Sequence, residues 1–564
     1  MDGPAASVDG ETPSEPSPQA QPLPKVVDIA KAGDLILDVT FENSKATVKA
    51  ARKQQASSLK ANAVGGQSSA GTGSSPPRSK LRLGFRVDAG VLRRQSQYFD
   101  RLLSDTRFQE AKTIAAALEA LTLRNVKPAD ADARDLPWIQ VIDDDDATHY
   151  AYRDNVFADL LRLLHGKETT VAASAAASAP TPAATAKTAG STATPAAPAT
   201  PPPTLDFCTA LAILADRFDC AAPVAKALKA AGGLRIKWPV TQRKQPPSGN
   251  GGGEEVKMSR QTESVLRQKI LVSYLLDQPP RFLAATRELI MNGSCKWSAF
   301  PDPNEAAEAE EASWWYLQDE LEQELQYRRE CILNTLASIP RHFLALYSSR
   351  TRQCKLGYDS SAACDSYQLG EMFKFFVNKN LLFLVDFSPG SLDRIADTSL
   401  TPVEGILAAL KQVPSYQIDS HHRNCGLRTL IMPVLEFVTA LLSANSVPVA
   451  RPTWKQRTKN QHQATSTVAW FSEAGVAAAA VAEGKRLKFE SGDGGEDDGS
   501  PPGTFRFTRA VASDPRLRFE HALGADQFAR DVLTAPAWNW TADQDAPPIT
   551  SGFGRTPNLR MMYR

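Results

Sequence analysis

The sequence lacks an excess of either charge, because its 564 residues include 64 lysines and arginines against 63 aspartates and glutamates. A chain without net charge exerts no long-range attraction on nucleic acid or on an anionic membrane. It also lacks any recognised nucleic-acid-binding motif. We therefore expect neither nucleic acid nor membrane among its partners, unless a local patch binds one.

Long apolar runs are also missing. The longest, 381–387 and 475–482, fall well short of the roughly 20 residues that a membrane-spanning helix needs. No apolar stretch opens the sequence as a secretory signal would. These absences predict a soluble intracellular protein, in the cytoplasm, the nucleus or both.

Cysteines are few: seven are scattered along the chain, an odd number that does not suggest a disulfide framework. One constellation is nevertheless informative, because Cys354 and Cys364 are followed by His421, His422 and Cys425. Thiolates and imidazoles are the ligands of a tetrahedral zinc site. The sequence thus offers a candidate metal site made of Cys354, Cys364, His422 and Cys425.

The spacing of these ligands supports the site only in part. Two residues separate His422 from Cys425, as in many structural zinc sites, but nine separate Cys354 from Cys364. The alternative is that the cysteines are small buried residues and that the histidines lie in a polar turn. We expect no catalytic cofactor, and zinc is the one candidate ion.

A thiol hydrolase is a second alternative, with Cys354 as nucleophile, His421 as base and Asp365 as the residue that orients the base. Nothing in the sequence places Cys354 at a helix start or beside a dedicated base, and signatures of thiol enzymes are absent. The carboxylates at 143–146 lack the spacing of a calcium loop, which favours a solvated turn or a helix start. We expect no enzymatic activity.

The first 240 or so residues alternate between apolar and low-complexity segments. Apolar patterns predict strands within 26–41, 81–87 and 138–142, and helices that include 91–103, 114–123, 156–164, 205–218 and 224–231. The segments 42–80 and 169–204 have the composition of flexible insertions.

Four segments fit one another once these insertions are removed: GDLILDVTF, LRLGFRVDAGVLRRQSQYFDRLL, WIQVIDDDD with AYRDNVFADLLRLLHG, and LDFCTALAILADRFDC. In that order they resemble a BTB/POZ domain of fungal proteins over residues 27–237. The matching positions include Asp38, Val39, Val91, Leu92, Ser96, Phe99, the stretch 160–166, Asp216 and Cys220. Asp88 stands where many relatives have a histidine.

The resemblance implies an α+β fold that binds other proteins and performs no chemistry. In the family, such a domain mediates homotypic or heterotypic association, and in some relatives it contacts the cullin scaffold of a ubiquitin ligase. Asp38, Val39, Val91, Leu92 and Phe99 are the candidate interaction residues that it implies. Expected partners are therefore other proteins, including a second copy of the chain or a cullin.

Beyond this domain the sequence predicts a mostly helical second half. An acidic stretch at 305–324 passes into an apolar pattern that predicts one long helix carrying Trp314 and Trp315. The predicted organisation is a disordered arm at 1–26, the BTB/POZ-like domain at 27–237, a linker at 238–261, a helical domain at 262–446 and a largely disordered tail at 447–564.

The tail contains a basic cluster at 484–488 that resembles a weak nuclear address, and scattered aromatic residues that suit docking motifs. The alternative for the basic cluster is an exposed patch without a role. Together these features predict a non-enzymatic adaptor or scaffold. The alternative function is a nuclear regulatory factor with a zinc-stabilised helical domain.

Overall fold

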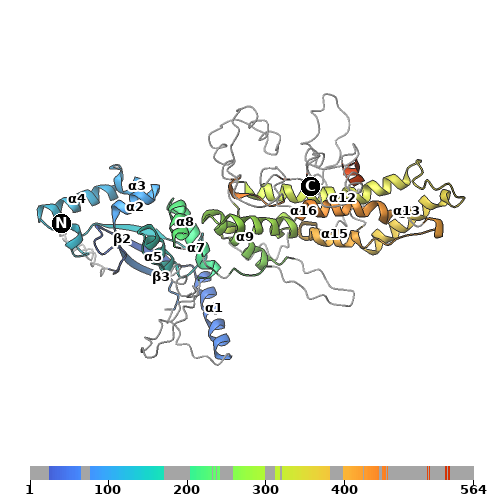
Figure 1. Ribbon diagram of the computed structural model, residues 1–564. Helices are drawn as coiled ribbons and strands as arrows, with labels where there is room; N and C mark the ends of the chain where they lie inside the picture. The colour runs from blue at the N-terminus through green and yellow to red at the C-terminus, as the bar shows by residue number, and fades with distance from the viewer. Residues whose placement is uncertain are drawn as a thin grey trace, which may run out of the picture. The chain divides into compact units, whose positions relative to one another are not determined.

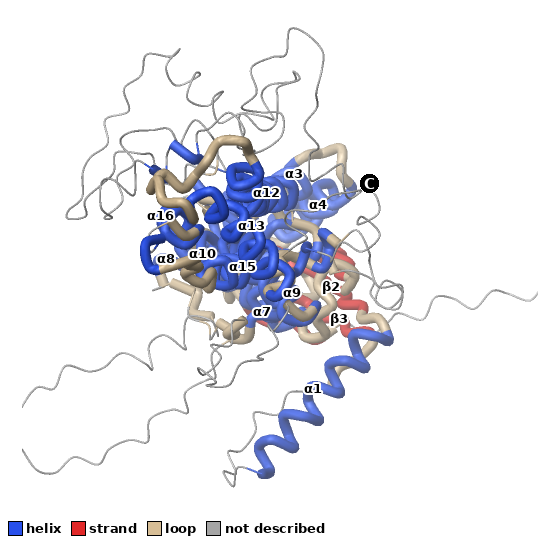
Figure 2. Tube along the Cα trace, turned by 90° about the vertical axis from the view of Figure 1, so that its right-hand side faces the viewer, coloured by secondary structure: helices blue, strands red, loops and turns tan. Residues whose placement is uncertain are grey.

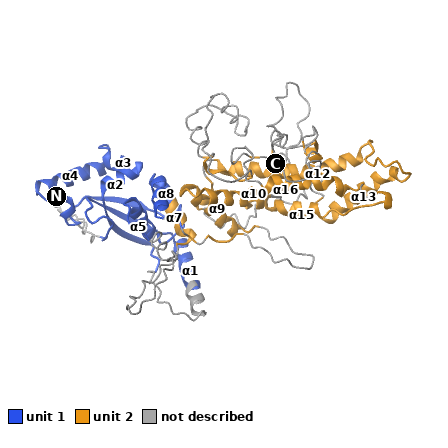
Figure 3. Ribbon diagram, in the orientation of Figure 1, with its two compact units in different colours: residues 1–201, 213–234 blue, residues 202–212, 235–564 orange. Residues whose placement is uncertain are grey.

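The structure, a computed structural model, contains two compact units (Figures 1 and 3). Unit 1 comprises 1–201 and 213–234, and unit 2 comprises 202–212 and 235–564. The residues whose placement is described are 24–64, 76–169, 203–231, 233–234, 236, 238–241, 258–298, 312–317, 320–381, 398–422, 425–443, 447–452, 454, 505, 507, 528–529 and 531–533. They form one small sheet and many helices, which is compatible with the predicted α+β class.

The sheet of unit 1 has four strands in the order β1-β3-β2-β4. Strand β2 pairs antiparallel with β3, with Leu35 opposite Val87, and parallel with β4, with Ile36 opposite Trp138. Strand β1 adds to β3 in parallel. The strands are β1 (Lys25–Asp28), β2 (Leu35–Glu42), β3 (Lys80–Val87) and β4 (Trp138–Asp143).

The apolar run at 35–41 forms β2, as predicted, but a separate strand, β1, precedes it across a turn at 29–34. The predicted disordered arm extends too far, since β1 begins at Lys25 and its backbone pairs with β3. The short β1 escaped notice because four residues carry little periodic signal.

The predicted flexible insertion at 42–80 contains a helix, α1 (Lys45–Val64), which extends away from the other helices of the unit in both views (Figures 1 and 2). Its Lys-, Ala- and Gln-rich sequence favours a helix, and the Ser44 hydroxyl accepts a hydrogen bond from the Thr47 N–H at 3.2 Å. The ends of the insertion meet where Asn43 N–H donates to Ser79 O at 2.7 Å and Lys80 pairs with Glu42 at 2.8 Å. Of the second predicted insertion, 170–202 lies outside the described residues.

The helices after β3 are α2 (Ala89–Gln95), α3 (Gln97–Ser104), α4 (Gln109–Leu123), α5 (Arg153–Leu164), α7 (Leu205–Arg217) and α8 (Ala221–Ala230), and all lie near predicted positions. The one helix predicted at 91–103 is instead two, because Ser96 has an extended backbone between α2 and α3. The division between the units falls inside α7. Asp88 and Ser96 cap α2 and α3, because their side chains accept from Val91 N and Phe99 N.

An aromatic cluster joins the sheet of unit 1 to its helices. Phe157 of α5 lies 5.9 Å from Phe41 of β2 and 5.4 Å from Phe85 of β3, measured between ring centroids. Phe218 contacts Phe157 at 5.6 Å and stacks on Phe99 of α3 at 5.3 Å. All five rings are 2% exposed or less, so they form a continuous part of the core.

Unit 2 is helical over the described part of 262–446, as predicted. Its helices are α9 (Arg260–Leu275), α10 (Pro279–Asn292), α12 (Leu321–Ser348), α13 (Ser361–Asn378), α15 (Val403–Lys411) and α16 (Leu427–Ser443). They share one apolar core whose members include Leu266, Phe282, Ile332, Phe376, Leu407 and Phe437.

The long helix of unit 2 begins later than its sequence suggested. Helix α12 starts at Leu321, because Glu320 has a left-handed backbone with φ of 59° that interrupts the helix. Trp314 and Trp315 instead lie in η3 (Ser313–Trp315), a short 3₁₀ turn. The acidic residues 305–311 lie outside the described part of the chain.

Several residues of the predicted tail belong to the core of unit 2. Phe505 and Phe507 are 1% and 0% exposed, and Val447, Val449, Trp454, Ala529, Val532 and Leu533 join the same core. The prediction of a disordered tail is therefore wrong for these residues. The basic cluster at 484–488 and the other tail aromatics lie outside the described residues, except Phe528, which is partly buried against the core.

Among the described residues, one helical segment, Ser420–Ser443, is long and apolar enough to cross a membrane by length and composition. Half of its most apolar window is buried inside the structure. Its helix α16 supplies eight buried residues to unit 2, so packing in the core already accounts for its apolar character.

Candidate metal centre

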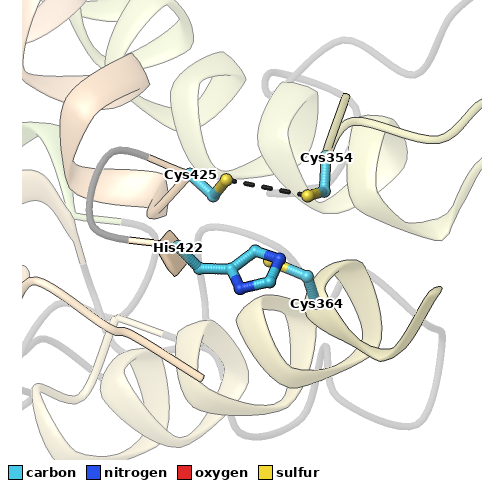
Figure 4. Close-up of side chains that lie close together, drawn as sticks. All are labelled: Cys354, Cys364, His422 and Cys425. Atoms are coloured by element: carbon cyan, nitrogen blue, oxygen red, sulfur yellow. Dashed lines mark hydrogen bonds between the residues drawn. The ribbon is translucent and has the colours of Figure 1, made fainter. Parts of the chain in front are cut away.

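The four predicted metal ligands meet in unit 2 (Figure 4). Cys354 lies in the connection between α12 and α13, and Cys364 in the first turn of α13. His422 ends η6 (Ser420–His422), and Cys425 lies two residues before α16. Their ligand atoms all lie within 4.8 Å of one another, so segments far apart in the sequence converge on one point.

The distances match donors around an ion better than a disulfide. The Sγ atoms of Cys354 and Cys425 are 3.6 Å apart, and all seven cysteines are free. A disulfide requires about 2.05 Å between its sulfurs. Zinc–sulfur bonds of about 2.3 Å in a tetrahedron separate two sulfurs by about 3.8 Å. The observed separation is close to this edge.

The cluster is buried. Cys364 and His422 are fully buried and Cys354 is 3% exposed, whereas Cys425 is partly exposed. Three soft sulfur donors and one imidazole, shielded from water, form a donor set that can bind a metal such as zinc. A bound cation would also compensate thiolates that burial otherwise disfavours.

Two carboxylates organise the segments around the cluster. Asp365, next to Cys364, accepts the backbone N–H groups of Gln353 and Cys354 at 2.7 and 3.0 Å. Asp419 lies 2.7 Å from Nδ1 of His422. Each carboxylate thus fixes a segment that carries one of the cluster's donors.

The thiols differ in their readiness to ionise. Burial disfavours the thiolate of Cys354, but hydrogen bonds with Ser361, the Leu356 backbone, Cys425 and Cys364 outweigh it and lower its pKa to about 7. Burial and the neighbouring Cys354 raise the pKa of Cys364 to about 12 and that of Cys425 to about 11. Without a cation, one negative charge in the cluster discourages a second.

The catalytic alternative is not assembled in this geometry. His421 is exposed and stacks near Tyr358, with ring centroids 4.9 Å apart, whereas His422 turns toward the cysteines (Figure 4). Asp365 is bonded to backbone N–H groups. Cys354, His421 and Asp365 therefore do not form the hydrogen-bonded series of nucleophile, base and orienting acid that a thiol hydrolase needs.

Sequence reasoning missed Asp419. It precedes His422 by three residues in DSHHRNCG. Its carboxylate accepts hydrogen bonds from His422 and Ser360, of which the bond from His422 has the larger effect, and they lower the pKa of Asp419 to about 2. The same hydrogen bond raises the pKa of His422. A carboxylate beside a metal-ligating histidine is a common arrangement and was the available signal.

The acidic run at 143–146 is not a solvated turn throughout. Asp143 is 1% exposed and pairs with Arg153 at 2.6 Å, and Asp145 accepts from the backbone N–H of Ser44 at 3.0 Å. Both carboxylates are engaged within the fold. The prediction of a solvated turn is therefore wrong for these two residues.

The candidate interaction residues lie mostly inside unit 1. Val39, Leu92 and Phe99 are 0% exposed, and Asp38 is 3% exposed and paired with Arg82 at 2.5 Å. Val91 is half-buried. These residues stabilise the fold, and a partner that leaves the fold intact must contact others.

Comparison of the chain with protein families, curated proteins and solved structures found no match in any of the three.

Proposed function

We propose that the protein is a non-enzymatic adaptor whose unit 1 is a BTB/POZ-like interaction domain. The observation that carries the proposal is the sheet connectivity, with an antiparallel β2–β3 pair and β4 parallel to β2. The order strand, strand, helix, strand, helix, helix is the one that the resemblance implies. Helices α2 and α3 follow β3, and α5 follows β4, in agreement with that order.

Most of the candidate interaction residues are buried, so the proposed surface for binding a partner lies elsewhere in unit 1, near the start of α4. Phe108, which precedes α4, is 43% exposed, and Tyr98 of α3 is 41% exposed. Exposed aromatic side chains are frequent energetic centres of protein interfaces. The proposed partner is a second copy of the chain or a cullin-type scaffold.

Light scattering and affinity purification of the full chain test this proposal. We expect a dimer, or a co-purified cullin, that Phe108→Asp abolishes while the thermal unfolding midpoint stays within about 2 °C. Lys49→Glu, on the exposed side of α1, is the control and should keep the partner. A monomer that recovers no protein partner would count against the adaptor function.

A second proposal concerns unit 2, where the Cys₃His cluster favours a structural zinc ion. Three thiolates and one imidazole fill the four positions of a tetrahedral site and leave none open for a substrate, which is the pattern of structural zinc. This supports the zinc-stabilised part of the alternative function, a nuclear regulatory factor. Localisation of a chain with Lys485→Ala and Arg486→Ala tests its nuclear part.

Metal analysis of the full chain tests the zinc ion. We expect about one zinc per chain, lost in Cys425→Ser because a hydroxyl is a poor substitute for a thiolate. Cys295→Ser is the matched control, since Cys295 is a partly buried cysteine outside the cluster. A Cys425→Ser chain that retains both its fold and its zinc would refute the site.

A further inference from the structure

We infer that Asp419 is the positioning residue of the metal centre: it holds His422 in the tautomer that presents Nε2 to the ion. The inference rests on the proposed zinc site. It goes beyond the four ligands, because it states which imidazole nitrogen binds and which residue decides it.

The first step is the hydrogen bond between Asp419 and His422. Oδ1 of Asp419 lies 2.7 Å from Nδ1 of His422, and an ionised carboxylate can only accept. Nδ1 therefore carries the proton, which leaves the lone pair of a neutral imidazole on Nε2. Nε2 is also the nitrogen nearer Ser361 of α13, at 3.4 Å from its Oγ. The side of the ring that carries Nε2 thus faces the helix that bears Cys364.

The second step is that the carboxylate itself is held in place. Oδ1 of Asp419 also accepts from the backbone N–H groups of His421 and His422 at 2.8 and 3.2 Å. Oδ2 accepts from the Ser360 hydroxyl at 2.8 Å. Ser360 immediately precedes α13, whose first turn carries Cys364. Asp419 thereby connects the His422 segment with the helix that supplies another ligand.

The third step is the difference between Asp419 and the other carboxylate at the cluster. Asp365 holds the backbone of Gln353 and Cys354, so it fixes where the Cys354 segment lies. Asp419 bonds to the ring of a ligand, so it fixes how that ligand binds. Its side chain is 32% exposed, whereas that of His422 is fully buried. The carboxylate is thus partly exposed and also reaches the buried ring.

The test compares Asp419→Ala and Asp419→Asn with wild type in the full chain, and uses Asp359→Ala, an exposed carboxylate in the connection that carries Cys354, as control. Zinc affinity is measured by competition with a chromophoric chelator. Loss of such a carboxylate typically costs about 10- to 100-fold in metal affinity, which we expect for Asp419→Ala. Asp419→Asn should lose less, because its amide oxygen still accepts from Nδ1–H.

A second readout separates positioning from a merely structural role. Nitrogen-15 NMR of His422 in the zinc-loaded chain should show the proton on Nδ1 in wild type and in Asp359→Ala. Weaker zinc binding together with a changed ring tautomer in Asp419→Ala would support the inference. Affinity within about twofold of wild type, or metal bound through Nδ1 in wild type, would overturn it and leave the zinc site standing. A wild-type chain that does not bind added Zn²⁺ would overturn both.

Discussion

Arg153 is a charged side chain that unit 1 buries completely, at the start of α5. Nε donates to Asp143 Oδ2 at 2.6 Å, Nη1 to Asn43 Oδ1 and Tyr150 O, and Nη2 to the carbonyls of Glu42 and Asp143. Every N–H of the guanidinium is thus satisfied, and the ends of β2 and β4 are tied to α5. Burial raises the pKa of Asp143 although Arg153 and Arg217 oppose the shift.

Replacing Arg153 with Met should destabilise unit 1 strongly, because Asp143 would lose its buried counter-ion and three backbone carbonyls would lose their donor. Breaking a buried pair from one side typically costs about 3–5 kcal/mol in the free energy of unfolding. Chemical denaturation followed by hydrogen exchange of β2 amides measures the loss. Arg93→Met is the control, because the Arg93–Asp100 pair is about half exposed and such pairs contribute about 1 kcal/mol or less. Equal losses in the two variants would contradict the role of burial.

His165 should make unit 1 sensitive to acid. Its Nε2 accepts from the Asp88 N–H at 3.1 Å and its Nδ1 lies 2.8 Å from Leu161 O, so the folded ring is neutral. Burial lowers its pKa below the ordinary 6.5. The unfolded chain then binds the proton more tightly than the folded chain does. The stabilising contribution of neutral His165 is therefore complete above about pH 6.5 and is lost as the pH falls below that value.

The measurement is hydrogen exchange of unit 1 amides between pH 7.5 and 5, corrected for intrinsic exchange. The free energy of unfolding obtained from exchange should fall below about pH 6.5 in wild type. This pH dependence should be weaker in His165→Gln. Unit 2 contains His342, whose pKa burial also lowers, so only unit 1 amides are informative. An unchanged pH dependence in the variant would assign the effect to another group.

At the scale of elements, single polar residues decide where helices begin and end. Ser96 ends α2 and begins α3: its Oγ accepts from Phe99 N at 3.0 Å and donates to Phe218 O at 2.6 Å. Gly293 ends α10 with φ of 85°, and a Cβ there would lie 1.7 Å from Ser399 O. Both residues set the direction of the chain between packed segments.

Ser96→Ala should therefore destabilise unit 1 by about 1–2 kcal/mol, because a helix cap is lost and a buried carbonyl loses its donor. Denaturant titration of the full chain, read on the unit 1 transition, measures the change. Ser104→Ala, at the exposed end of α3, should change stability by less than about 0.5 kcal/mol. A cost for Ser96→Ala no larger than that for Ser104→Ala would show that the cap contributes little.

Some elements and site residues could be predicted from the sequence and others could not. Alternating apolar residues located β3, because a half-buried strand leaves a period of two, and the apolar residues of 138–142 located β4. Helix α1 was missed because Ser and Gly in 65–75 dominated the composition of the whole segment. His422 and Cys425 were recognisable from local spacing, but Cys354 is 71 residues from Cys425, and only the packing of α12, α13 and α16 brings them together. Phe505 was misjudged because its neighbours in sequence are polar.

At the scale of the molecule, the chain has two units with separate cores, and the metal cluster lies entirely in unit 2. An ion bound only by the folded state stabilises that state through mass action. Its effect on stability should therefore be specific to one unit.

Chelation should lower the unfolding temperature of unit 2 and leave that of unit 1 unchanged. We expect a decrease of about 5 °C or more for the unit 2 transition, since 1 kcal/mol corresponds to about 2–4 °C in a domain of this size. Scanning calorimetry with and without a chelator, repeated on Cys425→Ser as the metal-free reference, measures it. Added Zn²⁺ should reverse the decrease in wild type alone. Equal shifts of the two transitions would contradict a site confined to unit 2.

The meeting of Asn43 with Ser79 at the base of the α1 insertion has a practical consequence. The two backbones are one hydrogen bond apart, so the chain leaves the sheet and returns to it at almost the same point. Lengthening such a connection adds little closure entropy, and insertions succeed at exposed sites of this kind. The connection between β2 and β3 is therefore a suitable position for inserting a fluorescent reporter or for placing the new termini of a circularly permuted chain.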